Sequence, residues 1–189
     1  MYKYSLLLLL TSAAPPVMAQ TIPPEVAAEQ VMHDLNSGGF ALGQNGNANF
    51  KYAQTFNLPR TGMVSHIMLP INCSTATSVR VTLQTLLRSG VPSGAVAMTQ
   101  DVPGYVLDSW TSTNGMQSMR MIEFERPRVM QAGNYAFTIE AIGGECVLWP
   151  GPAGDSYAGG QAFLINGVSL LSWYPWPRDL AFQVFERPR

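Results

Sequence analysis

Residues 78–87 read SVRVTLQTLL, and this stretch decides the fold class. Apolar side chains (Val79, Val81 and Leu83) alternate here with polar ones (Arg80, Thr82 and Gln84). A period of two is typical of a β-strand with one face buried and the other in water. The alternation returns over residues 135–141 and again over residues 180–184. The sequence therefore predicts half-buried strands, as in an antiparallel sheet.

Turn signals separate these strands from shorter candidate strands at residues 53–58, 63–69, 116–124, 146–149 and 161–165. The turn signals are Gly-, Pro- and Asn-rich, as in Pro92-Ser93-Gly94, Ala132-Gly133-Asn134 and Asn166-Gly167. About eight strands at this spacing favour an all-β fold, an antiparallel β-sandwich of the jelly-roll type.

The N-terminal part of the mature chain gives a different expectation. Apolar residues recur at one-turn spacing over Pro23–Leu35, and Ser37-Gly38-Gly39 would end such a helix. The Gly- and Asn-rich residues 40–51 indicate a loop. We therefore expect one short N-terminal helix followed by a connector into the sandwich.

The first 19 residues have the three parts of a secretory signal peptide. Lys3 supplies a positive start, residues 5–14 an apolar run, and Val17-Met18-Ala19 a small-residue cleavage site. The apolar run is shorter than the roughly 20 residues that cross a bilayer. We expect a cleaved leader over residues 1–19, a helix and connector over residues 20–50, a β-sandwich over residues 51–189, and a secreted or periplasmic product with no transmembrane segment.

The charge balance argues against nucleic acid as a partner. The chain has 11 basic and 12 acidic residues, so loss of Lys3 with the leader leaves 11 − 1 = 10 basic residues and a net charge of −2. Binding to a polyanion needs clustered Lys and Arg side chains. Lys51 is the only lysine after the leader.

Cys73 and Cys146 are the only two cysteines. In an oxidising compartment two such residues are expected to form a disulfide bond. The alternative is a pair of separate buried thiols.

Several short segments occur in an order that resembles a known class of module. The segments are Ala53-Gln54-Thr55-Phe56, Val91-Pro92-Ser93-Gly94, residues 124–135, residues 157–162 and Asp179-Leu180-Ala181-Phe182. Their order is similar to that in jelly-roll accessory modules of secreted bacterial proteins, which often stand beside anchoring or sorting segments. The resemblance covers residues 50–186 and implies a fold like that of carbohydrate-binding domains.

The stretch Trp173-Tyr174-Pro175-Trp176-Pro177 is the candidate binding site. Flat aromatic rings held in a loop by prolines can stack on the C–H face of a sugar. We therefore predict ligand contacts from Trp173, Tyr174 and Trp176. The alternative is that one or two of these rings close the end of the core.

Two aspartates are candidate ligands for a structural calcium ion, which needs several oxygen ligands. They are Asp155, in a Gly-rich loop, and Asp179, just before the last strand. Aspartates in loops also cap turns, and we weigh this interpretation above calcium. No other cofactor is expected.

The methionines allow two interpretations. Met116, Met119, Met121 and Met130 are close in sequence, and Met63, Met68 and His66 lie elsewhere in the chain. Thioethers select Cu(I), so an exported copper-binding protein is one interpretation. Methionine also fills cores, and we favour this role because Met119 and Met121 share a strand face.

No residue set forms a recognisable catalytic motif. A Gly-x-Ser-x-Gly elbow, a His-Glu-x-x-His pair and a phosphate loop are all missing from the sequence. Glu123 and Glu125 would point to one face of a strand, as in a glycosidase, but flanking arginines favour a solvated ion-pair face. We therefore predict a non-catalytic module that binds a glycan or cell-surface component. The alternatives are a structural or adhesive subunit of an envelope assembly and a polysaccharide hydrolase.

Overall fold

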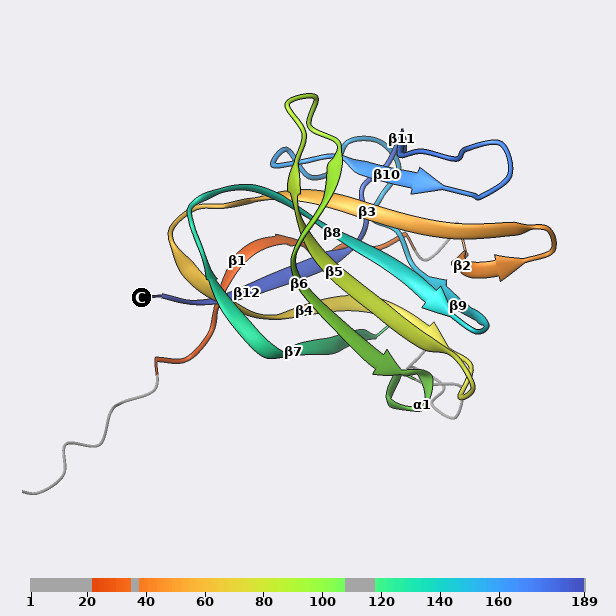
Figure 1. Cartoon of the computed structure of the whole chain (residues 1–189), viewed down its shortest axis with the longest axis horizontal. Coiled ribbons are helices and arrows are strands. Elements are labelled where there is room, and N and C mark those ends of the chain that lie inside the picture. The colour runs from red at the N-terminus through yellow and green to blue at the C-terminus, as the bar shows by residue number, and fades with distance from the viewer. Residues whose placement is uncertain (1–21, 35–37, 108–117, 189) are drawn as a thin grey trace, which may run out of the picture.

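The computed structural model describes residues 22–34, 38–107 and 118–188, and within them the chain is all-β (Figure 1). Twelve strands form one hydrogen-bonded network in which the described strand pairs are antiparallel. The strands are β1 (Glu25–Gln30), β2 (Phe40–Asn45), β3 (Ala48–Leu58), β4 (Gly62–Cys73), β5 (Ser78–Leu86), β6 (Pro92–Pro103), β7 (Met119–Met130), β8 (Gly133–Ile142), β9 (Glu145–Leu148), β10 (Ala162–Ile165), β11 (Tyr174–Pro175) and β12 (Phe182–Pro188). One short helix, α1 (Gly104–Leu107), follows β6.

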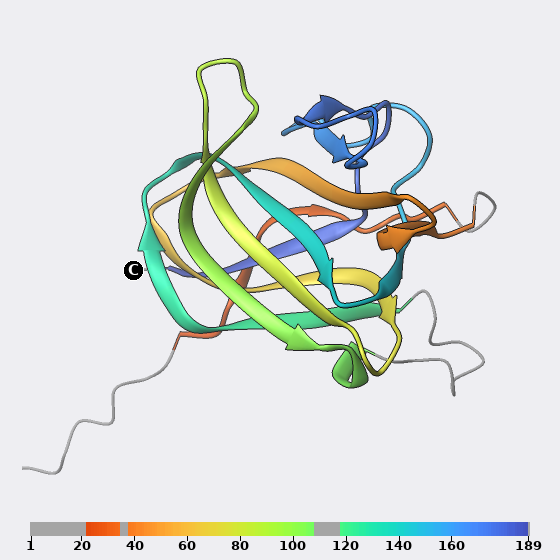
Figure 2. The same ribbon diagram turned by 45° about the vertical axis from the view of Figure 1, so that its right-hand side comes forward.

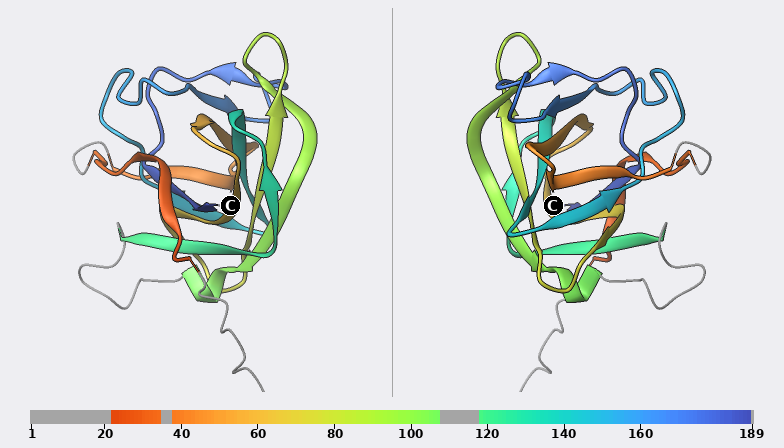
Figure 3. Two further views of the ribbon diagram at one scale, coloured as in Figure 1. Left: turned by 90° about the vertical axis from the view of Figure 1, so that its left-hand side faces the viewer. Right: turned by 90° about the vertical axis from the view of Figure 1, so that its right-hand side faces the viewer.

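The strands form two layers. The first layer has the order β1-β12-β4-β7, and the second layer has the order β11-β10-β3-β8-β5-β6. Strands β9 and β2 pair with each other and join β4 of the first layer to β3 of the second. The end views show the strands curving around one interior (Figure 3). The predicted sandwich is therefore confirmed.

The core lies between the layers. Phe56 and Phe137 of the second layer and Phe182 of the first layer are fully buried. The rings of Phe137 and Phe182 meet edge to face across the interior, with centroids 5.3 Å apart. This geometry is favoured by the ring quadrupole. The alternation in β5 places Val79, Val81 and Leu83 in the same core, as the sequence predicts.

The predicted N-terminal helix is wrong. Residues 25–30 form β1, which pairs with β12, the C-terminal strand. Ala28 of β1 is buried against the core. Pairing with an available strand edge supplies backbone hydrogen bonds and burial at once, and this tertiary context outweighs local helix propensity.

The predicted loop over residues 40–51 is also wrong, because these residues form β2 and the start of β3. Asn45 lies opposite Ala48 in a two-residue hairpin. Gly46, the first residue of the turn, has a φ of +59°. A type II′ hairpin turn needs positive φ at this position, which glycine adopts without strain.

The predicted disulfide is confirmed: Cys73 of β4 and Cys146 of β9 lie opposite each other and are bonded. Disulfides form and persist in oxidising compartments. No helix in the described residues has the length and apolar character of a membrane span. The predicted leader, residues 1–19, lies outside the described residues.

Candidate functional site

A groove of about 490 Å³ lies on the outer face of the second layer. Figure 2 shows the tip of the β5–β6 hairpin and the blue β10–β11 ribbon at the top of the molecule. They belong to the two edges of the layer whose middle strands are β3 and β8. Side chains from five strands and from the segment before β11 line the groove: Lys51, Arg80, Thr82, Gln84, Val96, Thr99, Thr138, Ile139, Glu140, Ile165 and Trp173.

The strand pleat places the polar residues of the groove. Successive side chains of a strand point to opposite faces, so burial of Val81 and Leu83 in the core turns Arg80, Thr82 and Gln84 to the other face, where neighbouring side chains still largely cover Thr82 and Gln84. The register sets Thr82 opposite Thr138 and Arg80 opposite Glu140. In the sequence, the alternating polar residues predict strands and give no sign of a groove. The same residues form the floor of the groove, a role that the prediction missed.

A network of charges borders the groove, which Lys51, Arg80 and Glu140 line. The Nε and Nη2 atoms of Arg80 donate to the two carboxylate oxygens of Asp101, each at 2.8 Å. Lys51 pairs with Glu140, and Arg80 Nη1 lies 3.7 Å from the other oxygen of Glu140. The hydrogen bond from Arg80 lowers the pKa of Asp101 below its usual range. The Arg80–Asp101 pair therefore remains charged at neutral pH.

Hydroxyl and amide groups occupy the middle of the groove floor. Thr82 and Thr99 share a hydrogen bond between their Oγ1 atoms at 3.3 Å. Gln84 Nε2 donates to Thr138 Oγ1 at 3.2 Å, and Gln84 Oε1 accepts from the backbone N–H of Gly94 at 2.8 Å. These bonds hold the side chains in place beside the charged network. The floor thus presents fixed donors and acceptors of several kinds.

The three aromatic residues predicted as ligand contacts separate in the structure. Trp173 lines the groove. Tyr174 is 58% exposed. The ring of Trp176 packs against Phe40 and Tyr52, with centroids 5.0 Å away in each case. Trp176 is therefore positioned for core closure, the alternative weighed for these rings, and the three residues form no common platform.

The pairing of β11 explains why Trp173 and Trp176 point to opposite sides, whereas Tyr174 stays exposed because β11 is an edge strand. Tyr174 lies opposite Leu164 and Pro175 opposite Phe163. Cross-strand partners point to the same side of a sheet, whereas neighbours along a strand point to opposite sides. Leu164 packs against the core, so the outward-facing position falls to Trp173 beside Ile165 in the groove.

The two predicted calcium ligands differ in their surroundings. Asp179 is buried, and its Oδ2 atom accepts hydrogen bonds from the backbone N–H groups of Ser156 and Tyr157 at 2.8 and 2.9 Å. Its Oδ1 atom accepts from Gln54 Nε2 at 3.0 Å. Asp155 is exposed. In the described part of the chain, no three His, Cys, Asp or Glu side chains gather where they could hold a metal ion.

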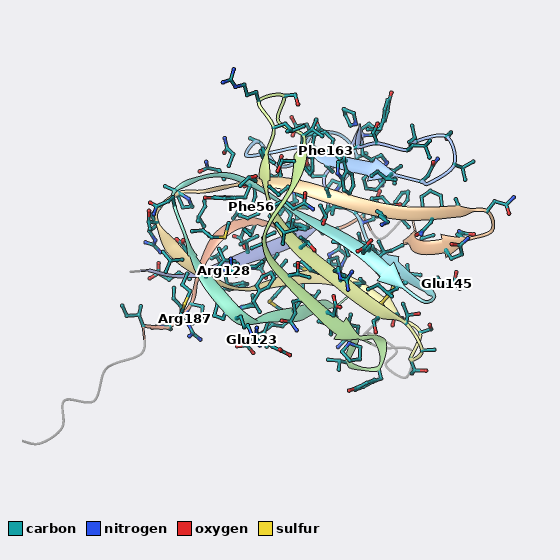
Figure 4. The ribbon with its side chains drawn as sticks, in the orientation of Figure 1. Phe56, Glu123, Arg128, Glu145, Phe163 and Arg187 are labelled. Atoms are coloured by element: carbon teal, nitrogen blue, oxygen red, sulfur yellow. A yellow bond between two sulfur atoms is a disulfide. The ribbon has the colours of Figure 1, made fainter. Side chains whose placement is uncertain are left out.

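Glu123 and Glu125 lie on the outer face of β7, and neither lines the groove. Figure 4 shows Glu123 pointing away from the sandwich. Its cross-strand partner His66 stacks on Phe185, with ring centroids 4.2 Å apart. Burial lowers the pKa of His66, Glu123 opposes the shift, and Arg187 adds to it. Glu123 and Glu125 share one face of the strand, as predicted, and this face belongs to the first layer, whereas the groove lies on the second.

The groove combines an aromatic ring with fixed polar groups. No family model, curated protein or solved structure matches the chain.

Proposed function

We propose that the protein is an exported, non-catalytic module that binds a carbohydrate in the groove on the outer face of the second layer. The observation that supports this most directly is Trp173 beside a floor of hydroxyl, amide and paired charged side chains. A sugar ring has an apolar C–H face and a rim of hydroxyl groups. The indole ring suits the first, and the polar floor suits the second.

The fixed geometry of the groove favours this function. Its floor side chains are already hydrogen-bonded to one another, so binding requires little ordering of flexible groups. Arg80 and Glu140 provide one donor-only and one acceptor-only group for the hydroxyls of a ligand. The confirmed disulfide is consistent with a role outside the cytosol.

Affinity electrophoresis in gels containing soluble polysaccharides, preceded by a glycan array, tests the proposal. We expect retardation of the full chain by at least one glycan, and about a tenfold loss of affinity in Trp173→Ala, since aromatic stacking contributes about 1 kcal/mol beyond area burial. Tyr174→Ala is the matched control, because this exposed ring lies outside the groove. Equal retardation of Trp173→Ala and the unaltered chain would exclude the groove as the binding site.

A further inference from the structure

The outer face of the first layer brings together soft metal ligands that are far apart in the sequence. His66 and Met68 of β4 alternate with buried Ile67 and Leu69, so both point outward. On β7, buried Ile122 turns Met121 and Glu123 outward in the same way. Strands β4 and β7 pair, with Met68 directly opposite Met121 and His66 opposite Glu123.

Sheet geometry places three of these side chains within reach of one ion. Directly opposite residues have Cβ atoms about 4.5–5.5 Å apart, and diagonal neighbours are about 7–8 Å apart. Met68 and Met121 are an opposite pair, and His66 is the diagonal neighbour of Met121. The long, flexible thioether side chains can close the remaining gap. Met119, two residues before Met121 on the same face, lies at the edge of the cluster.

The exposure of Met121 argues against a purely structural role. Its side chain is 53% exposed, and those of Met68 and Met119 are half-buried. The interpretation of Met119 and Met121 as core residues is therefore wrong, because the face that they share is the outer one. The core positions of this part of β7 belong to Ile122 and Phe124.

The orientation of His66 leaves one ring nitrogen for a ligand. His66 Nδ1 lies 3.0 Å from Ser65 Oγ, and Ser65 Oγ donates its proton to the carbonyl oxygen of Phe185 at 3.4 Å. When the single proton of the hydroxyl goes to that carbonyl, Nδ1 is the protonated ring nitrogen and donates to Ser65. The lone pair then belongs to Nε2. A fixed second nitrogen of this kind is the usual arrangement around metal-bound histidines.

We propose that His66, Met68 and Met121 form a binding site for Cu(I) on the outer face of the first layer. Thioethers and imidazole suit this soft, monovalent ion, whereas calcium and magnesium require oxygen ligands. Both cysteines of the chain form the disulfide, so no thiol competes for the ion. The exposed carboxylate of Glu123 beside the cluster adds a favourable negative charge. The site is independent of the carbohydrate groove.

Anaerobic titration of the full chain with Cu(I), against the coloured Cu(I) chelator bathocuproine disulfonate, tests the site. We expect the unaltered protein to withhold one equivalent of Cu(I) from the chelator. Met68→Leu, Met121→Leu and His66→Gln should each weaken this affinity about tenfold or more. Met130→Leu is the matched control, because Met130 is a buried methionine of the same strand. His33→Gln is the corresponding control for the imidazole.

A second measurement on the unaltered chain does not depend on how the variants fold. In NMR spectra, Ag(I), a redox-inert substitute for Cu(I), should shift the methyl resonances of Met68 and Met121 and leave that of Met130 in place. Failure of the unaltered chain to withhold Cu(I) from the chelator would overturn the proposal. So would unchanged affinity in both Met68→Leu and Met121→Leu, or equal shifts at Met130.

Discussion

The outer faces of the two layers share a backbone pattern and differ in chemistry. On the second layer, β5 and β8 present hydroxyl, amide and ion-paired groups beside Trp173. On the first layer, β4 and β7 present thioethers and an imidazole. In both cases every second residue of a strand fills the core and the intervening residues are free for other roles. The same alternation that specifies the sandwich therefore provides the two separate surfaces on which we propose binding.

The largest expected effect is on the sandwich itself, because both surfaces depend on its fold. Asp179 bonds to Gln54 of β3 and to the 156–157 loop, just before β12 of the first layer begins. We expect Asp179→Ala to lower the free energy of unfolding by about 3 kcal/mol, because one buried and two part-buried donors lose their acceptor. Urea denaturation measures the loss, and both carbohydrate and Cu(I) affinity should fall with it.

Asp155→Ala is the control for Asp179→Ala, and it also tests the calcium hypothesis. Asp155 is exposed, so we expect its substitution to change stability by less than about 0.5 kcal/mol. The chelator EDTA should likewise leave the melting temperature unaltered if the role of Asp179 is to accept protein hydrogen bonds. A lower melting temperature in EDTA that Asp155→Ala abolishes would instead assign calcium to this pair.

A smaller effect is expected from the aromatic residues near β11. Trp176→Ala should destabilise the protein by about 2 kcal/mol, less than a fully buried tryptophan, because the ring is half-buried against Phe40 and Tyr52. Tyr174→Ala should be nearly neutral, since Tyr174 is mostly exposed. Thermal unfolding of both variants measures the difference. If Tyr174→Ala were the more damaging change, the inward assignment of Trp176 would be wrong.

Sequence patterns predicted the parts of the fold that rest on alternation. Strands β5 and β8 and the disulfide of Cys73 are all present. Strand β6 was missed, because Pro92-Ser93-Gly94 has the composition of a turn and the exposed edge strand has a weaker apolar phase. Strand β1 was missed because its pairing partner, β12, is more than 150 residues away in the chain, and local periodicity carries no record of such a partner.

The candidate sites show the same limit. The motif Trp173-Tyr174-Pro175-Trp176 suggested one aromatic platform, whereas alternation and the packing of Trp176 separate its rings. The Met68–Met121 pair could not be found from the sequence, because it depends on the register between β4 and β7. Residue type was readable from the sequence, and the positions of residues across strands required the structure.

The smallest predicted effect concerns the charges of the groove, which distinguish its face from the thioether cluster. Arg80 lowers the pKa of Asp101 by a direct hydrogen bond, so Arg80→Gln should raise the pKa of Asp101 toward its usual value, as measured by carboxyl NMR titration. A carboxylate with a depressed folded-state pKa stabilises the fold above its unfolded-state pKa, and this contribution disappears as the pH falls through the folded-state value.

The unaltered chain should therefore lose stability more steeply than Arg80→Gln on acidification below about pH 4. Near neutral pH the two proteins should differ little, because both partners are largely solvated and exposed ion pairs contribute about 0–1 kcal/mol. Lys51→Gln, which removes the neighbouring cation that pairs with Glu140, is the control and should leave Asp101 unchanged. An unchanged pKa of Asp101 in Arg80→Gln would mean that Arg80 does not set the charge of this face. The difference in charge between the two surfaces would then have another cause than the ion pairs of β5 and β8.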